Sequence, residues 1–147
     1  MATANLGRAS LSKKFDLDWR QVQRGVPLSL LDEFVRYSRF EMADLQKVVI
    51  SLRTLDRRRL RLKPLSLNEG DRLARVARLF SLAVKIFGGP AKARRWLTCS
   101  NAHLDGRRPL SIIRTGVGGR AVEELLFQTE NEMHVETDRA SVTVTRG

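Results

Sequence analysis

A long amphipathic helix with its own start and stop signals constrains the fold of this chain more than any other feature. Ser66 is followed three residues later by Glu69, which is the pattern of a capping box. Apolar residues then recur at helical spacings of three and four, at Leu73, Val76, Phe80, Ala83 and Phe87. Gly88-Gly89 and Pro90 end the pattern and favour the start of a new helix. The sequence therefore predicts a helix over 67–87.

Shorter helices are predicted on both sides of this segment. Upstream, Pro27 favours a helix over about 27–37, a short apolar set follows from Met42 to Val49, and Ser51 can cap a third helix that runs to about Arg61. Downstream, three apolar sets predict helices around Trp96, around Ile112 and from about Val122.

The glycines of 116–119 are expected to break the chain before the last helix, and Trp96 is expected to lie on the packed side of its own helix. The alternating Ser-Val-Thr-Val-Thr of 141–145 is the one stretch with strand character. The fold class is all-α. We divide the chain into a loose N-terminal arm with a short helix (1–24), a helix-turn-helix region (25–66), a linker helix with a small helical domain (67–133) and a C-terminal tail (134–147).

The charge of the chain is strongly positive and unevenly distributed. Twenty-seven Lys and Arg residues face 16 Asp and Glu, which favours a polyanionic partner such as nucleic acid or an anionic membrane surface. Residues 120–147 reverse the balance, with three basic and six acidic side chains. An acidic end on a basic body indicates two faces with different partners, although an acidic tail that only aids solubility would have the same composition.

The densest basic segment, Arg53 to Lys63, lies on a predicted helix that follows a short helix and a tight connection. This is the layout of a helix-turn-helix, whose second helix enters the DNA major groove. Leu52 and Leu55 can pack inward, which leaves Arg53, Arg57 and Arg61 as an outward stripe. The candidate DNA-binding residues are Arg53, Thr54, Arg57, Arg58, Arg59, Arg61 and Lys63. A merely solvated charged face is the alternative, and membrane-surface binding is less favoured because the helix lacks bulky apolar residues opposite its charges.

No pattern in the chain predicts an enzyme, a cofactor or a metal site. Cys99 with His103 and His134 cannot supply four zinc ligands at the usual spacing. The glycines of 116–119 follow no strand and precede no Lys-Ser/Thr, so they fit neither nucleotide-binding fingerprint. The N-terminus lacks the apolar core of a secretory signal, and a cytoplasmic location is expected.

The segment Ile86 to Leu126 resembles the toxin-binding region of the Xre/MbcA/ParS antitoxin family. The residues that carry the resemblance are Phe87-Gly88, Ala93, Trp96-Leu97, Asn101, Leu104, Gly106, Pro109-Leu110, Thr115, Gly118, Val122 and Leu126. Upstream, Arg53 to Arg58, Leu65-Ser66 and Asp71 to Leu73 are similar to the family's Xre-type helix-turn-helix and linker helix. Two positions depart from the pattern: Ser100 replaces a proline, and Val49 replaces a turn glycine, where a β-branched residue resists positive φ.

The resemblance implies an antitoxin that neutralises a RES-domain toxin, an enzyme that consumes NAD or uses it to ADP-ribosylate, by occluding its NAD site. It also implies autorepression through operator DNA. Because helix-turn-helix repressors usually bind two half-sites as dimers, we expect a homodimer within a larger toxin–antitoxin complex, and we expect no membrane partner. The candidate toxin-binding residues lie on the acidic last helix: Arg120, Glu123, Glu124, Phe127, Glu130 and Asn131. A stand-alone transcription regulator with a C-terminal dimerisation domain is the main alternative. An RNA-binding protein is less favoured because no exposed aromatic side chains are expected for base stacking.

Overall fold

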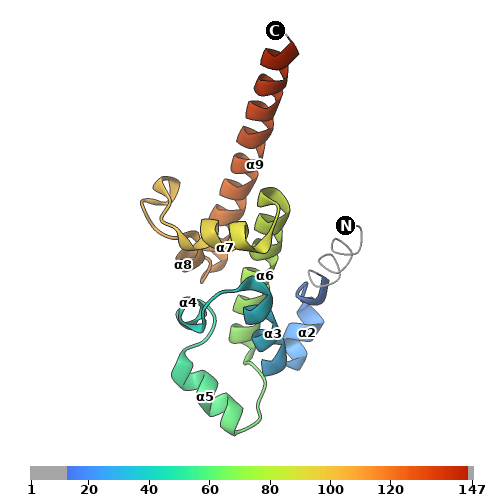
Figure 1. Cartoon of the computed structure of the whole chain (residues 1–147). Helices are drawn as coiled ribbons and strands as arrows, with labels where there is room; N and C mark the ends of the chain where they lie inside the picture. The colour runs from blue at the N-terminus through green and yellow to red at the C-terminus, as the bar shows by residue number, and fades with distance from the viewer. Residues whose placement is uncertain (1–12, 146–147) are drawn as a thin grey trace.

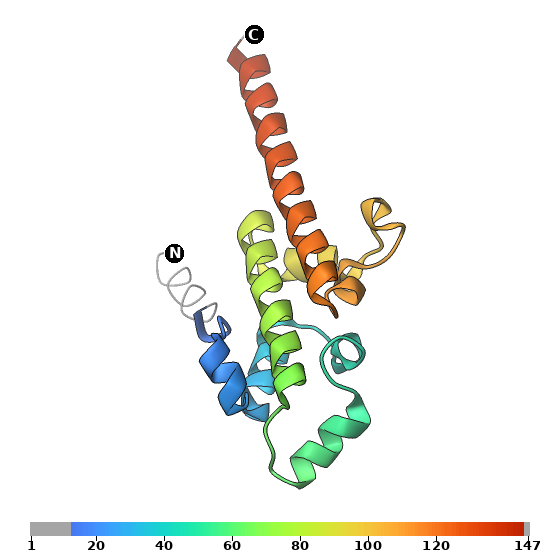
Figure 2. The same ribbon diagram turned by 180° about the vertical axis from the view of Figure 1, so that it is seen from behind.

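The computed structural model describes residues 13–145, with side chains as far as residue 141, and these residues form helices joined by short connections. Two long helices, α6 and α9, lie side by side and form the frame, and shorter helices pack around them (Figure 1; Figure 2). Within the described range the only β feature is an isolated bridge between Asn101 and Arg107. The all-α prediction is confirmed.

The segment before residue 25 is part of the core as far as the structure describes it. α2 (Trp19–Arg24) begins with a capping box between Asp18 and Gln21, and its Val22 is buried. Phe15 is also buried, with its ring 5.4 Å from that of Phe34. The predicted short helix is confirmed, but residues 13–24 are not a loose arm. Phe15 and Val22 pack this segment against the core. The segment is too short for a hydrophobic periodicity that would predict this packing from the sequence. The remainder of the predicted arm, 1–12, lies outside the described residues.

Three helices complete the N-terminal half, at the places where the sequence predicts them. α3 (Leu28–Ser38) follows Pro27, whose fixed φ suits a helix start, and buries Leu31 and Phe34. The next two helices are α4 (Met42–Gln46) and α5 (Leu52–Leu60). Ser51 caps α5, since its Oγ accepts a hydrogen bond from the Thr54 N–H at 3.2 Å.

The central helix α6 (Leu67–Phe87) has the predicted bounds and is about 32 Å long. At its start the Ser66 Oγ accepts a hydrogen bond from the Glu69 N–H, and the Glu69 carboxylate accepts one from the Ser66 N–H at 2.7 Å. At its end Gly88 adopts the left-handed conformation, with φ 88°. Phe80 on its apolar face is fully buried against aromatic rings of α3 and the residues just after it. α6 therefore carries the core of both halves of the molecule.

The C-terminal half wraps around the far end of α6. It contains α7 (Pro90–Thr98), a short 3-10 helix η1 (Ala102–Leu104) and α8 (Pro109–Ile112), close to the predicted positions. Trp96 is half-buried, with its ring 5.7 Å from that of Phe87, so its predicted packing role is confirmed. This contact packs α7 onto the last turn of α6.

The last helix, α9 (Gly116–Thr145), is longer than the sequence predicts, at 30 residues or about 45 Å. Its first turns pack on α6, and the remainder projects beyond the body (Figure 1; Figure 2). Every side chain from 131 to 141 is exposed. The strand character assigned to 141–145 is wrong, because α9 remains helical through Thr145; a two-residue alternation of β-branched residues over five positions does not override an established helix.

The glycines of 116–119 do not break the chain; they form the first turn of α9. A Cβ on Gly118 would lie 1.9 Å from the carbonyl oxygen of Ile112, and one on Gly119 would lie 2.8 Å from Cδ of Arg75. Glycine at these positions lets α9 approach α8 and α6 closely. The sequence alone does not distinguish this use of glycine from a helix stop.

Replacement of Gly118 by alanine should destabilise the fold by about 3 kcal/mol, at the upper end of overpacking penalties, because the obstructing carbonyl is backbone and cannot rotate away. Denaturant unfolding measures this change. Gly116→Ala is the matched control: its Cβ would meet only an Arg75 nitrogen at 4.0 Å, so it should leave stability unchanged or slightly raised. Equal midpoints for the two variants would contradict the close-approach explanation.

Arg75 of α6 holds the C-terminal half in place. Its Nη1 donates hydrogen bonds to the carbonyl oxygens of Ile113 (3.2 Å) and Arg114 (3.1 Å), just before α9. Its Nη2 pairs with Asp71 at 2.7 Å. One guanidinium therefore satisfies the carbonyls between α8 and α9 and fixes that connection against the linker helix.

Candidate DNA and partner-protein interfaces

α4, the turn after it and α5 form a helix-turn-helix at one end of the molecule (Figure 1). Val48, Val49 and Ile50 in the turn are buried, and they anchor the connection to the core. Val49 is not among the described residues with positive φ, so this turn forms without the glycine that such motifs often carry. Its carbonyl oxygen accepts a hydrogen bond from Nε of Arg72 on α6 at 3.0 Å.

The outward face of α5 and the turn that follows it are cationic. Arg53 and Arg57 lie on the helix, whereas Arg61 and Lys63 follow its last residue, Leu60. All four are exposed, and none of them forms an ion pair within the described residues. Leu55 is buried and fixes the opposite face. These four side chains can therefore reach an external polyanion without breaking an internal salt bridge.

Leu52 does not pack inward as predicted: it is 38% exposed. The reason is its position as the first residue of α5, where the helix has only begun to turn away from the core. Leu60 and Leu62 are more exposed still, at 86% and 92%, beside the outward arginines. The helix is thus held to the body by a single buried leucine, and polar contacts supply the rest of its attachment.

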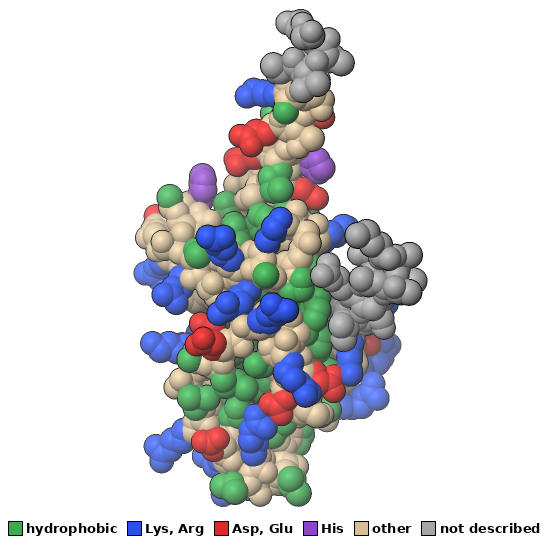
Figure 3. Space-filling view, in the orientation of Figure 1, with side chains coloured by type: hydrophobic (Ala, Val, Ile, Leu, Met, Phe, Trp, Pro, Cys, Tyr) green, Lys and Arg blue, Asp and Glu red, His purple; other side chains and the backbone are tan. Residues whose placement is uncertain are grey.

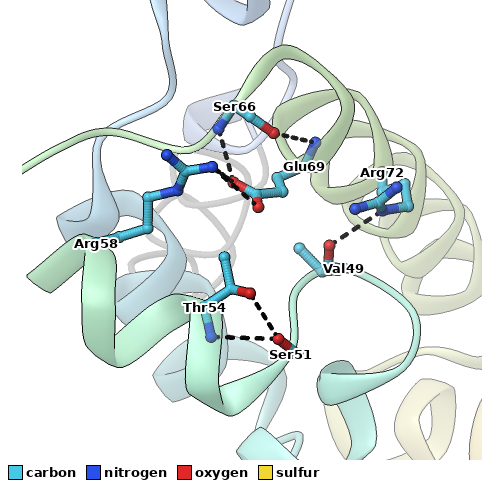
Figure 4. A network of polar contacts seen from close by, with 7 residues as sticks. All are labelled: Val49, Ser51, Thr54, Arg58, Ser66, Glu69 and Arg72. Atoms are coloured by element: carbon cyan, nitrogen blue, oxygen red, sulfur yellow. Dashed lines mark hydrogen bonds and ion pairs between the residues drawn. The ribbon is translucent and has the colours of Figure 1, made fainter.

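Two arginines of the predicted DNA-binding set bind to the protein itself. Nη2 of Arg58 lies 3.3 Å from the buried carboxylate of Glu69 on α6 (Figure 4). Arg59 makes a two-point pair with Asp32 of α3, at 3.0 and 2.7 Å. Arg58 and Arg59 thus orient α5, the second helix of the helix-turn-helix, against α6 and α3. Their charges are already partly neutralised by these carboxylates.

Thr54 is engaged in the same way at the other end of the helix, since its hydroxyl accepts a hydrogen bond from the Ser51 hydroxyl at 2.8 Å (Figure 4). Of the seven sequence-derived candidates, Thr54, Arg58 and Arg59 therefore position the helix, and the other four form its free surface. Spacing along one helix cannot reveal this division, because the partners of Arg58 and Arg59 come from other helices.

The pKa of the Arg59 guanidinium is raised above its ordinary value, chiefly by its hydrogen bonds to Asp32, while partial burial acts in the opposite direction. A group with a raised pKa in the folded state contributes stability below its unfolded pKa and loses it only as pH rises through the folded pKa. For a guanidinium that window lies well above neutral pH. The Arg59 side of this pair therefore keeps its charge at neutral pH.

Glu69→Gln should lower the free energy of unfolding by about 1–3 kcal/mol, because it leaves the partly buried Arg58 without its countercharge. Thermal or denaturant unfolding measures the loss. Asp71→Asn on the same helix is the matched control: its carboxylate is 61% exposed, and such a pair contributes at most about 1 kcal/mol. If both variants lose the same stability, the Glu69–Arg58 pair does not hold α5 on α6.

The candidate partner surface lies on α9 beyond its buried stripe. Val122, Leu125 and Leu126 are buried, as predicted, and anchor the helix. The candidate residues Arg120, Glu124, Phe127 and Asn131 are exposed, with Phe127 at 45%, and Glu130 is half-exposed. Glu123 differs from them: it is half-buried, and its carboxylate pairs with Arg78 of α6 at 2.8 Å.

Other classes of site find no support in the part of the chain that the structure describes. No group of three or more His, Cys, Asp or Glu side chains there could hold a metal ion, and Cys99 is an exposed free thiol. Between residues 13 and 145 no helix combines the length and the apolar character needed to cross a membrane. What remains is a cationic helix at one end and a polar helix with an exposed aromatic residue at the other.

A helix-turn-helix joined by a linker helix to a small α-helical domain defines a class of two-domain helix-turn-helix proteins, and comparison with known families places the chain within that class. Residues 20–78 match the antitoxin Xre-like helix-turn-helix domain. Residues 82–131 match the antitoxin Xre/MbcA/ParS C-terminal toxin-binding domain. The chain belongs to the Xre/MbcA/ParS family of antitoxins.

Three curated relatives carry the name antitoxin Xre. The protein from Pseudomonas putida is 40% identical over 80 residues, which are 54% of this chain and 50% of the relative, so the match spans about half the length of that protein. The proteins from Yersinia enterocolitica and Photorhabdus laumondii are 28% and 27% identical over 112 residues, 75% of this chain and 76% of each relative.

Proposed function

We propose that this protein is the antitoxin of a toxin–antitoxin pair, which neutralises a RES-domain toxin by covering its NAD site and represses its own promoter as a DNA-binding protein. The observation that carries the proposal is the separation of two exposed surfaces on one rigid frame. The cationic face of α5 and the projecting part of α9 lie at opposite ends of the molecule (Figure 1). A chain built in this way can bind DNA and a partner protein at the same time.

The charges of the two ends favour different partners. Arg53, Arg57, Arg61 and Lys63 present unpaired cations that suit phosphates and guanine edges. The exposed part of α9 carries carboxylates beside Phe127, and this combination suits a cationic pocket that normally receives the phosphates of NAD. We place the protein in the cytoplasm, where its promoter and its toxin would be found.

The binding experiment is co-expression with the product of the adjacent gene, which the proposal expects to be a RES-domain protein, followed by co-purification. The proposal expects a stable complex, and it expects that complex to retard promoter DNA. A chain that binds promoter DNA but never retains the neighbouring gene product is instead the stand-alone regulator.

Helix-turn-helix repressors commonly bind two half-sites as dimers, so the purified chain should have at least twice the monomer mass of 16.7 kDa in solution. A monomer mass with and without DNA would rule out the dimer.

A further inference from the structure

A groove of about 370 Å³ lies between α4, the first helix of the helix-turn-helix, and the segment around α8 in the toxin-binding domain. Three basic residues line it. Lys47 ends α4, Arg108 precedes α8, and Arg114 follows α8. All three are exposed. The two domains thus contribute cations to one shared groove, although these residues lie far apart in the sequence.

The positive charge of this groove is not neutralised by the protein. Within the described residues, no ion pair involves Lys47, Arg108 or Arg114, whereas Arg58, Arg59, Arg75 and Arg78 are all paired. Asp44 is the one carboxylate of the lining, and its Oδ2 accepts a hydrogen bond from the Glu41 N–H at 3.0 Å, which completes the cap of α4. The groove therefore keeps a net positive charge.

The hydroxyl groups in the groove do not compete with the cations for an anion. Thr98 donates its hydroxyl proton to the Arg94 carbonyl at 2.7 Å, and Ser111 donates its proton to the Arg108 carbonyl at 2.7 Å. Both protons are already used, so any anion in the groove would be held by the ammonium and the two guanidinium groups. Guanidinium and ammonium groups in such an arrangement bind phosphate oxygens well.

The position of the groove relative to α5 indicates where such a phosphate would come from. In a helix-turn-helix the second helix enters the major groove and the first crosses the sugar–phosphate backbone. Here the first helix is α4, and Lys47 stands at its end. Figure 3 shows Lys and Arg side chains at intervals along the edge of the molecule that carries α8, α4 and α5, with a few acidic side chains among them. Basic side chains therefore occur from α5 past α4 and onto the toxin-binding domain.

We propose that this groove binds the phosphate backbone of the operator, through Lys47 from the helix-turn-helix domain and Arg108 and Arg114 from the toxin-binding domain. The proposal rests on the DNA binding proposed above and extends it: the toxin-binding domain contributes directly to the contact with DNA. Free phosphate and an acidic surface of the toxin could meet the same cations, and the experiment separates them from DNA.

The test measures binding of the chain to the DNA upstream of its own gene by fluorescence anisotropy, between about 50 and 200 mM salt. Each lost phosphate contact lowers the slope of log affinity against log salt by about 0.9, so the triple variant Lys47→Gln/Arg108→Gln/Arg114→Gln should lose up to about 2.7 from the slope. Its affinity at the lowest salt should fall at least tenfold. The variant should melt like the wild type, because all three side chains are exposed.

Arg20→Gln/Lys85→Gln/Lys92→Gln is the matched control, because it removes the same charge from three exposed residues outside the groove. Its slope should equal that of the wild type. A groove variant with the wild-type slope, or with weaker binding at an unchanged slope, would overturn the proposal. So would binding of inorganic phosphate in the groove while the DNA slope stays constant, or loss of toxin binding alone. If the wild type itself does not bind the promoter, the proposed DNA binding fails first, and this proposal fails with it.

Discussion

A triple variant Arg53→Ala/Arg57→Ala/Arg61→Ala should lose operator binding and keep toxin neutralisation. Arg53 and Arg57 are exposed on α5, Arg61 caps its end, and none of the three forms a salt bridge within the described residues. A contact to a phosphate or a base contributes about 1–3 kcal/mol, so removal of all three should weaken operator binding by at least about a hundredfold. Gel retardation and a promoter–reporter fusion measure the loss of binding and of repression.

Arg59 supplies the matched control for this triple variant. Its guanidinium binds Asp32, so Arg59→Ala should lower the melting temperature without changing the salt dependence of DNA binding. If the triple variant still represses the promoter, or if it loses toxin neutralisation as well, α5 is not a separate DNA-binding surface.

The double variant Glu124→Arg/Phe127→Asp should abolish protection against the toxin and leave repression intact. Phe127 is the large apolar side chain exposed on the candidate surface, and Glu124 is an exposed carboxylate one turn before it. A buried aromatic anchor contributes about 2 kcal/mol or more to an interface, and a reversed charge adds repulsion, so toxin affinity should fall about a thousandfold. Growth after toxin induction and co-purification of the two proteins measure the effect.

Trp19→Ala controls for the loss of an exposed aromatic residue, since Trp19 is 64% exposed on α2. It should protect cells as the wild type does. Truncation of α9 within its first turns is a poorer test, because Val122, Leu125 and Leu126 belong to the core and their loss would unfold the domain. Full protection by the double variant at normal expression would show that the toxin binds elsewhere.

The sequence predicts most of the helices, and local chemistry explains why. Ser66 with Glu69, Gly88 and Pro90 fix the ends of α6 and the start of α7 through contacts between near neighbours in the chain. Signals of this kind act within one turn and can be read without the fold. The errors at 116–119 and in residues 13–24 have a different origin, because both depend on packing between separate elements: Gly118 on Ile112 of α8, Gly119 on Arg75 of α6, and Phe15 on Phe34 of α3.

The candidate sites were predictable only in part, for the same reason. The four-residue spacing of Arg53, Arg57 and Arg61 identifies them as an outward stripe of the predicted helix. The ion pair of Arg58 depends on Glu69, eleven residues away, and the shared groove requires Lys47 to meet Arg108 and Arg114 across a domain boundary. Composition shows that the chain is basic, but only the fold shows which cations are free.

The most direct test of the proposed function titrates the proposed partner, a purified RES-domain toxin from the adjacent gene, with the full-length chain and measures NAD consumption. NAD consumption should fall in proportion to the added chain and stop at a fixed molar ratio. The variant Arg53→Ala/Arg57→Ala/Arg61→Ala should inhibit as the wild type does, whereas Glu124→Arg/Phe127→Asp should not. NAD consumption that continues unchanged at a molar excess of the folded chain would contradict the proposed function.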